Sequence, residues 1–357
     1  MSFMIYRMPA EWEPHAATWL AWPKNPTTWP GRMEAIPPVW IAMITALNEP
    51  VHLLVDDEST ETLVRVLLRI AGVAGDCVIF HHIPTDDAWI RDFAPTFVRG
   101  NDSVADSLLP PDNPRIRTGE ARSLFALNWI YNAWGEKYPP WAQDARAGGL
   151  IAAAAGVELV QPGFVLEGGS IEVNGSGTLM TTEQCLLNKN RNPHLSRADI
   201  EARLRTYLGV RQIIWLKEGI AGDDTDGHID DIARFVGSRT VVAAVESDPA
   251  DENYRPLREN FEFLQGQRDE RGRPLQVISL PMPRPIEYQG MRLPASYANF
   301  CIANGVVLVP VFDDPNDAKA LEILSPLFPG RCLAPILCRD VVIGLGGVHC
   351  VTQQQPL

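Results

Sequence analysis

The feature that most constrains the fold of this chain is a unit that recurs five times along it. A short run rich in β-formers comes first, and a polar turn and a second, partly alternating strand segment follow it. The first runs are CVIFHHI (77–83), VELVQ (157–161), IIWL (213–216), QVISL (276–280) and LAPILC (333–338). The segments that follow are AWIRDFAPTFV, GSIEVNGSGTLMTT, HIDDIARFVGSRTVVAAV, YANFCIANGVVLVPV and VHCVTQ. This pattern predicts a repeated α/β architecture.

Helical patterns precede several of these units. Residues 196–209, SRADIEARLRTYLG, have Ser196 as the expected N-cap and Gly209 at the expected stop. Residues 251–265 and 314–328 have similar helical patterns. The spacing is typical of radially repeated folds, so five mixed α/β units could close into a ring without free sheet edges. An ordinary α+β sheet with irregular connections would show the same pattern, and the pattern alone does not separate the two.

Composition narrows the class of protein and its partners. With 46% hydrophobic and 21% charged residues, the chain is typical of a soluble globular protein. The net charge of −13 and the absence of a basic run argue against nucleic acid or an anionic membrane as partner. We expect a cytoplasmic protein, because no export signal or membrane span is evident. The Pro- and Asp-rich stretch 101–120 is predicted to be a surface loop and not a domain boundary. We therefore expect residues 1–357 to form a single catalytic domain.

The cysteines show no pairing pattern of their own. They lie at positions 77, 185, 301, 332, 338 and 350, without a CxxC pair or the spacing of a secreted disulfide framework. Free thiols in a reducing compartment are mostly small buried hydrophobic side chains. A catalytic role for any one of them therefore needs support from its surroundings.

Polar residues at the start of each second strand segment supply that support. They are Trp89 with Asp92, Glu167 before two glycines, His228 with Asp230, Asn299, and His349 with Cys350. If the units are radially related, these positions converge on one pocket that holds a thiol, a histidine and three carboxylates. A thiolate is a nucleophile, and a histidine can carry protons near neutral pH. Buried carboxylates need a counter-ion, and a planar guanidinium would match them.

Other interpretations of the same residues are weaker. The stretch DDTDGHIDD (223–231) does not fit a calcium loop, because Gly222 and Ala233 would occupy carboxylate positions. The stretch GLGGVH (344–349) lacks the third glycine and the following helix of a dinucleotide site. His228, Asp230, His349 and Cys350 could also form a zinc site. Their spacing in the sequence does not match a known metal-binding motif.

Several motifs in order resemble the agmatine deiminases, which belong with the bacterial-type peptidylarginine deiminases. The motifs are WLAWPKNPTTWPGR (19–32), DDAWIRDFAPTFV (86–98), YNAWGEKYPPW (131–141), LEGGSIEVNGSGTLMTTEQCLLNKNRNP (166–193), TDGHIDDIARFV (225–236), YANFCIANGVVLVP (297–310) and HCVTQQQP (349–356). They span essentially the whole chain. The resemblance implies the pentein fold, a five-module α/β propeller with pseudo-fivefold symmetry.

The resemblance also implies roles for individual residues. Cys350 matches the family's nucleophile, His228 its general acid/base, and Glu167 the carboxylate near that histidine. The remaining matches are binding residues: Asp92 and Asp230 grip the guanidinium, Trp89 lines the pocket, and Asp224 faces the ammonium of the substrate. The family tail usually reads GGNIHC, whereas this chain has LGGVHC, so a glycine replaces an asparagine near the nucleophile.

The implied reaction is hydrolysis of agmatine to N-carbamoylputrescine and ammonia through a covalent thiouronium intermediate, with a place in putrescine and polyamine metabolism. Neither a metal nor an organic cofactor is expected, and the expected partner is a small cationic guanidinium compound. A deiminase of peptidyl-arginine or of another arginine derivative is the alternative. A metal-dependent hydrolase and a non-catalytic polyamine-binding protein are more distant alternatives, and the sequence leaves a homo-oligomer open.

Overall fold

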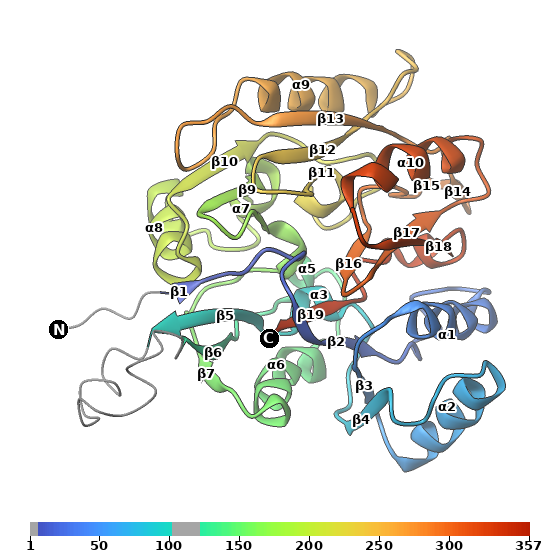
Figure 1. The fold of residues 1–357 in the computed structure, drawn as a ribbon. Helices are drawn as coiled ribbons and strands as arrows, with labels where there is room; N and C mark the ends of the chain where they lie inside the picture. The colour runs from blue at the N-terminus through green and yellow to red at the C-terminus, as the bar shows by residue number, and fades with distance from the viewer. Residues whose placement is uncertain (1–5, 102–121) are drawn as a thin grey trace, which may run out of the picture.

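The computed structural model of this chain describes residues 6–101 and 122–357, and almost all of the predicted loop at 101–120 lies outside them. Within these residues the strands form six sheets (Figure 1). Five of the sheets have three or four strands, and the sixth is a hairpin of β14 (Glu287–Tyr288) and β15 (Met291–Arg292). The chain therefore has an α/β fold made of several small sheets.

The five larger sheets share one topology. Each contains an antiparallel pair followed by a strand that runs parallel to the second member of the pair. The strands concerned are β5 (Thr96–Asn101), β6 (Arg122–Leu127) and β7 (Glu158–Val160); β8 (Glu172–Val173), β9 (Thr178–Thr182) and β10 (Gln212–Leu216); β11 (Ala233–Phe235), β12 (Thr240–Val245) and β13 (Gln276–Pro281); β16 (Cys301–Ala303), β17 (Val306–Val311) and β18 (Cys332–Leu337); and β19 (Gln353–Pro356), β2 (His15–Ala21) and β3 (Val51–Val55). The repeat therefore recurs in the structure, but its boundaries differ from the predicted ones, because the first run of each unit lies in a different sheet from the segment that follows it, as β7 and β8 do.

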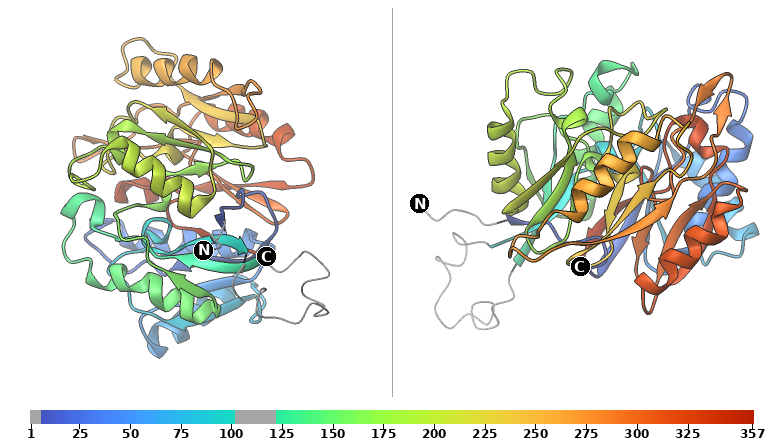
Figure 2. Two further views of the ribbon diagram at one scale, coloured as in Figure 1. Left: turned by 90° about the vertical axis from the view of Figure 1, so that its left-hand side faces the viewer. Right: turned by 90° about the horizontal axis from the view of Figure 1, so that it is seen from above.

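A helix connects the parallel strands within each unit, as parallel pairing requires. The longer connecting helices are α1 (Ile36–Ala46), α6 (Ala142–Ala155), α8 (Arg197–Leu208), α9 (Tyr254–Gln265) and α10 (Asn316–Leu324). These helices lie around the outside of the molecule in Figure 1, and the two turned views of Figure 2 show α8 and α9 on the faces turned towards the viewer. The described residues contain no closed sheet, so pseudo-fivefold closure into a propeller stays a prediction.

The remaining elements extend these units or connect them. Strand β1 (Tyr6–Arg7) pairs with β5, and β4 (Val78–His82), which follows α2 (Glu58–Ile70), pairs with β3. The short helices are η1 (Met33–Ala35), α3 (Ile90–Phe93), α5 (Ala133–Glu136), η3 (Gly168–Ser170), α7 (Glu183–Leu186), η4 (Ile229–Asp231), η5 (Ser325–Leu327) and η6 (Val341–Gly344). Helix η3 contacts both α3 and η4.

Local sequence signals predict several of these elements closely. The first run of every unit forms a strand, and the helix expected at 196–209 is α8. Ser196 caps α8 with a reciprocal bond to Asp199, and Gly209 ends it in the left-handed conformation. The other two expected helices begin later than predicted, at Tyr254 and Asn316.

The C-terminal segment differs from its prediction in one respect. VHCVTQ was expected as the second strand of the fifth unit, but residues 348–351 form a turn and the strand β19 begins at Gln353. Strand β19 pairs antiparallel with β2, near the start of the chain, and not with β18. The glutamines do anchor this segment, since Gln355 accepts from the Trp19 indole at 2.9 Å.

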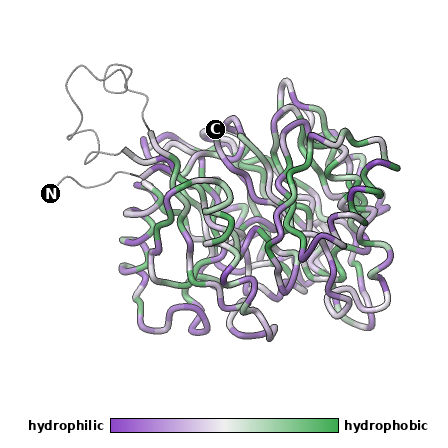
Figure 3. The backbone as a smooth tube through the Cα atoms, turned by 90° about the horizontal axis from the view of Figure 1, so that it is seen from below, coloured by the Kyte–Doolittle hydropathy of each residue, from purple (hydrophilic) through white to green (hydrophobic). Residues whose placement is uncertain are grey.

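The apolar residues lie between these sheets and their helices. They form three clusters of buried side chains, and the hydrophobic segments run through the interior in Figure 3, with hydrophilic segments on the outer turns. Among residues 6–101 and 122–357, none of the helices has the length and apolar character needed to cross a bilayer.

Candidate active site

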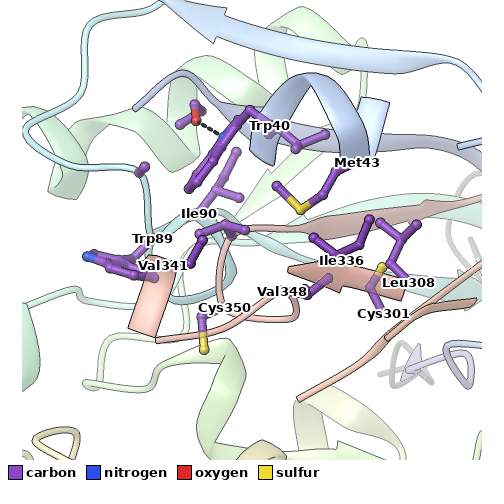
Figure 4. Close-up of a cluster of buried hydrophobic side chains, with 14 of the residues drawn as sticks. Trp40, Met43, Trp89, Ile90, Cys301, Leu308, Ile336, Val341, Val348 and Cys350 are labelled. Atoms are coloured by element: carbon purple, nitrogen blue, oxygen red, sulfur yellow. Dashed lines mark hydrogen bonds between the residues drawn. The ribbon is translucent and has the colours of Figure 1, made fainter. Parts of the chain in front are cut away.

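Cys350 lies in the turn between η6 and β19, at the edge of the largest apolar cluster. Its side chain points away from Trp40, Met43 and Leu308 of that cluster, whereas the nearby Val348 lies on the cluster side (Figure 4). The backbone of the turn is held by the Arg91 amide, which donates to the Cys350 carbonyl at 3.1 Å. Cys350 is 8% exposed, so its thiol is buried yet reaches a cavity.

Two glycines before Cys350 are required by close packing. A Cβ on Gly346 would lie 2.4 Å from the ring of Trp89, and one on Gly347 would lie 2.5 Å from Oδ1 of Asn299. Neither glycine has a positive φ, so the constraint is space and not backbone conformation. The tail can therefore pass directly over Trp89 only because these residues lack side chains.

His228 is placed by a capped turn. The Asp223 carboxylate accepts from the backbone amides of Gly227 and His228 at 2.9 and 3.0 Å, and Thr225 donates to the same carboxylate. The imidazole is 1% exposed, and its Nδ1 lies 3.9 Å from Oδ1 of Asp92. Burial opposes charging this ring, but the carboxylate of Asp92 and the other acidic groups nearby raise the pKa of His228 well above its usual value.

Asp92 lies on the short helix α3 and faces the imidazole. Its two carboxylate oxygens accept from the Gly169 amide and the Trp134 indole, each at 2.9 Å. A Cβ on Gly169 would lie 2.5 Å from Nδ1 of His228 and 3.0 Å from Asp92. The second glycine of LEGG is therefore the residue that lets these two groups approach. Burial and the charges of neighbouring acids raise the pKa of Asp92.

Glu167 precedes those glycines and is fully buried. Its Oε1 accepts from Nε of Arg191 at 2.5 Å, and Arg191 also contacts Asp226 at 2.7 Å. The second carboxylate oxygen, Oε2, is buried and has no hydrogen-bond partner in the part of the chain that the structure describes. An unpaired buried carboxylate oxygen is costly, so this atom is suited to a donor that comes from outside the chain.

Asp230 follows His228 by two residues and is also fully buried. Its Oδ2 faces Nδ1 of His349 at 2.7 Å, and the other ring nitrogen of His349 faces Glu11 at 2.9 Å. Burial alone would raise the pKa of Asp230, but His349 lowers it below the usual value. The second oxygen, Oδ1, is buried without a partner, as is Oε2 of Glu167.

Asn299 completes the surroundings of the thiol. Its Nδ2 lies 3.2 Å from Sγ of Cys350 and donates to Asp231 at 2.9 Å, while its Oδ1 accepts from the His349 amide at 2.9 Å. The repeat pattern predicts Asn299 in the converging set but gives it no role. Glu11 and Arg191 were missed, because no local motif shows that they contact residues far along the chain.

The charges around Cys350 disfavour its ionisation. Burial, followed by the carboxylates of Asp230, Asp231 and Asp92, raises the pKa of the Cys350 thiol well above its usual value. Asp230 is the closest of the hydrogen-bonding carboxylates, with Oδ2 3.9 Å from the sulfur. A positive charge placed among these groups would oppose both effects.

A cavity of about 940 Å³ opens onto this cluster. Cys350, Asp92 and Trp89 lie in its wall, whereas Glu167, His228 and Asp230 lie behind that wall. The cavity is also lined by aromatic and polar residues, among them Trp134, Tyr138, Trp141, Asp86, Asp87 and Asp224. The same cavity thus joins aromatic and acidic side chains to a thiol backed by carboxylates.

The three aspartates before His228 have different surroundings. Asp223 caps the turn of His228, and Asp226 bonds Arg191, so both are structural. Asp224 lies in the cavity wall, as predicted for a residue that contacts substrate. Lys137 and the hydroxyl of Tyr138 already contact its carboxylate, which reduces the charge it offers to the cavity.

The structure brings together the predicted residues Cys350, His228, Glu167, Asp92, Asp230 and Trp89 from separate units of the chain. The zinc set suggested by the sequence is not the one that clusters. In the described part of the chain, the side chains whose donor atoms lie within 4.8 Å of one another are Glu167, Cys185 and His228.

Comparison with known proteins gives the class of the chain. Residues 7–356 match the family described as Porphyromonas-type peptidyl-arginine deiminase, and the chain belongs to this family. It is 38% identical to the agmatine deiminase of Ectopseudomonas mendocina (strain ymp) and 39% identical to that of Pseudomonas fluorescens (strain SBW25). Each match covers 98% of this chain and 95% of the relative.

Solved structures agree with these relatives. The agmatine deiminase of Enterococcus faecalis superposes with a TM-score of 0.84 at 32% identity, over 98% of this chain and 96% of that one. A cysteine-to-serine variant of C. jejuni agmatine deiminase with substrate bound gives 0.84 at 29% identity, over 99% and 98%. The predicted resemblance is confirmed, and the chain is an agmatine deiminase-like hydrolase of the class that acts on C–N bonds of linear amidines.

Proposed function

We propose that this protein hydrolyses agmatine to N-carbamoylputrescine and ammonia, with Cys350 as the nucleophile. The observation that carries the proposal is a pair of buried carboxylate oxygens without partners, Oε2 of Glu167 and Oδ1 of Asp230, in the cluster around the thiol. Carboxylate oxygens of this kind accept from the planar N–H groups of a guanidinium, which also supplies the missing positive charge. The relatives named agmatine deiminase support the choice of substrate.

The bound cation also explains how the thiol becomes reactive. The pKa of Cys350 is raised in the substrate-free chain, so the nucleophile is protonated until a guanidinium enters. The charge of the guanidinium offsets Asp230 and Asp92, and the Asn299 amide stabilises the thiolate by donating to the sulfur. Ionisation is thereby coupled to binding, which limits reaction of the thiolate with other molecules.

The reaction proceeds in two steps. The Cys350 thiolate attacks the central carbon of the guanidinium, and a tetrahedral adduct forms with its nitrogens held by the carboxylates of Glu167, Asp230 and Asp92. His228 protonates one terminal nitrogen, ammonia leaves, and a thiouronium ester remains on Cys350. His228 then takes a proton from water, which attacks the same carbon. Collapse of that adduct expels the Cys350 thiolate, and the hydroxyl group loses its proton to solvent as the urea product is released.

The wider cavity accommodates the rest of the substrate. Trp89 packs beside the guanidinium, and Asp224 lies in the cavity wall where it can face the terminal ammonium of agmatine. Free arginine carries a carboxylate next to its ammonium, so Asp224 would repel it. We therefore propose that the site prefers agmatine to arginine.

The test is an ammonia-release assay with agmatine, arginine, a peptidyl-arginine and a methylated arginine. We expect agmatine to give the highest kcat/KM, and Cys350→Ser to release ammonia at less than about a hundredth of the original rate, since a covalent nucleophile contributes several kcal/mol. Cys332→Ser, at an exposed cysteine, is the matched control and should keep full activity. Faster turnover of a peptidyl-arginine than of agmatine would overturn the substrate assignment.

A further inference from the structure

Beside the proposed nucleophile, the chain has a second buried thiol that the reaction does not use. Cys185 lies in the short helix α7, is fully buried, and has its sulfur close to the general acid/base and its carboxylate. Its Sγ, a ring nitrogen of His228 and a carboxylate oxygen of Glu167 all lie within 4.8 Å of one another. Thiolate, imidazole and carboxylate together are the ligand types that Zn²⁺ and Cd²⁺ select.

The free atoms of this cluster point to a ligand. Arg191 occupies Oε1 of Glu167, and Asp92 faces Nδ1 of His228. The other two atoms, Oε2 of Glu167 and Nε2 of His228, are both buried, and neither has a hydrogen-bond partner among residues 6–101 and 122–357. These two atoms and the sulfur of Cys185 can together bind one ion, because each has a free electron pair once the imidazole and the thiol have lost their protons.

The surrounding charge also suits a divalent cation. The guanidinium of Arg191 lies next to this cluster, but it is matched by two carboxylates, those of Glu167 and Asp226. Asp92 adds a further negative charge next to His228, and an incoming cation would displace the proton of the His228 ring and that of the Cys185 thiol. The cluster therefore has an excess of negative charge that an ion of charge +2 would offset.

We propose that Glu167, Cys185 and His228 form a binding site for a thiophilic divalent cation such as Zn²⁺ or Cd²⁺. The ion would take three protein ligands and leave one position open. Because the reaction proposed above needs a free His228 and Glu167, the bound ion would inhibit it, in competition with the guanidinium substrate. This inhibitory consequence rests on the proposed function, whereas the binding of the ion does not.

Direct binding is measured on a protein from which the other reactive thiols are removed. Cys77, Cys332 and Cys350 are replaced by serine, and Cd²⁺ is added while the ultraviolet absorption of the cadmium–thiolate bond is recorded. We expect one equivalent of Cd²⁺ to produce this absorption, and the further change Cys185→Ser to abolish it. The matched control is Cys338→Ser, a buried cysteine outside the cluster, which should leave the absorption unchanged.

Absorption that persists after Cys185→Ser would overturn the proposal, as would the absence of cadmium–thiolate absorption in the protein that retains Cys185. Circular dichroism checks the fold of each variant. If Cys185→Ser does not fold, cadmium nuclear magnetic resonance is recorded on the protein that keeps Cys185. The chemical shift should show one thiolate ligand on the bound cadmium. A spectrum without a thiolate ligand would refute the site.

Inhibition is tested separately on the protein that keeps Cys350. Zn²⁺ should inhibit ammonia release, and more agmatine should relieve the inhibition. Cys185→Ser should raise the half-inhibitory Zn²⁺ concentration at least tenfold, with the rate of each protein expressed relative to its own rate without Zn²⁺. An unchanged half-inhibitory concentration would refute the inhibitory role. If agmatine is not hydrolysed at all, the proposed function fails, while the cadmium titration still tests the metal site.

Discussion

At the scale of single residues, Asn299 is the side chain whose replacement tests most directly how the thiolate of Cys350 is stabilised. It is a neutral donor to the sulfur in a pocket where Asp230, Asp231 and Asp92 all oppose the thiolate. Removing it would take away a direct hydrogen bond to the thiolate and would free Asp231. Asn299 therefore acts on the nucleophile more than on the binding of substrate.

We predict that Asn299→Ala lowers kcat about ten- to a hundredfold, because a hydrogen bond to a charged group contributes roughly 1.5–3 kcal/mol. In the Asn299→Ala variant, iodoacetamide should also alkylate Cys350 more slowly than in the original protein when a guanidinium compound is present. The control is Asn304→Ala, whose side chain contacts only the His15 backbone among the hydrogen bonds of the described residues, away from the thiol. A rise in KM alone for Asn299→Ala would contradict its role at the sulfur.

Asp224 is the residue for which the structure limits the expected effect. Lys137 already contacts its carboxylate, and the side chain is 40% exposed. Exposed charges contribute about 0–1 kcal/mol each, so Asp224→Asn should lower the ratio of kcat/KM for agmatine over arginine by no more than about fivefold. Added salt should reduce the difference further. An unchanged ratio at low salt would exclude Asp224 from the substrate site.

At the scale of elements, the turn before β19 determines where the nucleophile lies. Its path between Trp89 and Asn299 leaves no room for a side chain at Gly346 or Gly347. The family's usual asparagine at the position of Gly347 would meet Asn299 in this chain. Gly347, where the family usually has asparagine, therefore leaves the space that the Asn299 side chain occupies in this chain.

We predict that Gly347→Ala lowers kcat more than tenfold, because the new methyl group displaces the Asn299 amide from its contacts with Cys350 and Asp231. The matched control is Gly75→Ala, where an added Cβ has nothing within 4 Å and φ is not positive. The measurement is ammonia release together with the melting temperature. Full activity of Gly347→Ala would show that the turn tolerates the displacement.

Local patterns predicted the strands and helices of this fold better than the contacts between them. Ser196, Gly209 and the five apolar runs act over a few residues, so their signals can be read from the sequence. The pairing of β19 with β2 has no local signal, because it depends on packing across the chain. For the same reason the motifs indicated Cys350 and His228, but gave no sign of Glu11.

At the scale of the whole molecule, buried acids near the cavity link stability to pH. Burial raises the pKa of Asp144 to about 8, with the charge of Asp87 adding to the effect, although backbone amides of Asp86 and Asp87 donate to its carboxylate. The folded protein therefore binds a proton that the unfolded chain, with the usual value of 3.8, has released. Stability should fall as pH rises between these two values, and level off above the higher one.

We predict that Asp144→Asn makes the free energy of unfolding less dependent on pH between about pH 5 and about pH 8. The asparagine keeps an oxygen for the two backbone amides but has no proton to lose. The difference from the original protein across this interval should exceed about 1 kcal/mol, since one pKa unit corresponds to about 1.4 kcal/mol. Urea unfolding at several pH values measures it, with the exposed Asp76→Asn as control; parallel curves for the Asp144 variant and the original would refute the assignment.

The pairing of β19 with β2 also has a consequence for how the protein acquires activity as it folds. Gln353 pairs with Trp19, so this contact closes a loop that contains nearly all of the described chain. Contacts between residues far apart in sequence form slowly, because loop closure must precede them. The other units can be assembled from shorter segments, whereas Cys350 is fixed only when this last strand is in place. During refolding, compactness therefore precedes catalytic competence, and a partly folded chain is inert towards its substrate.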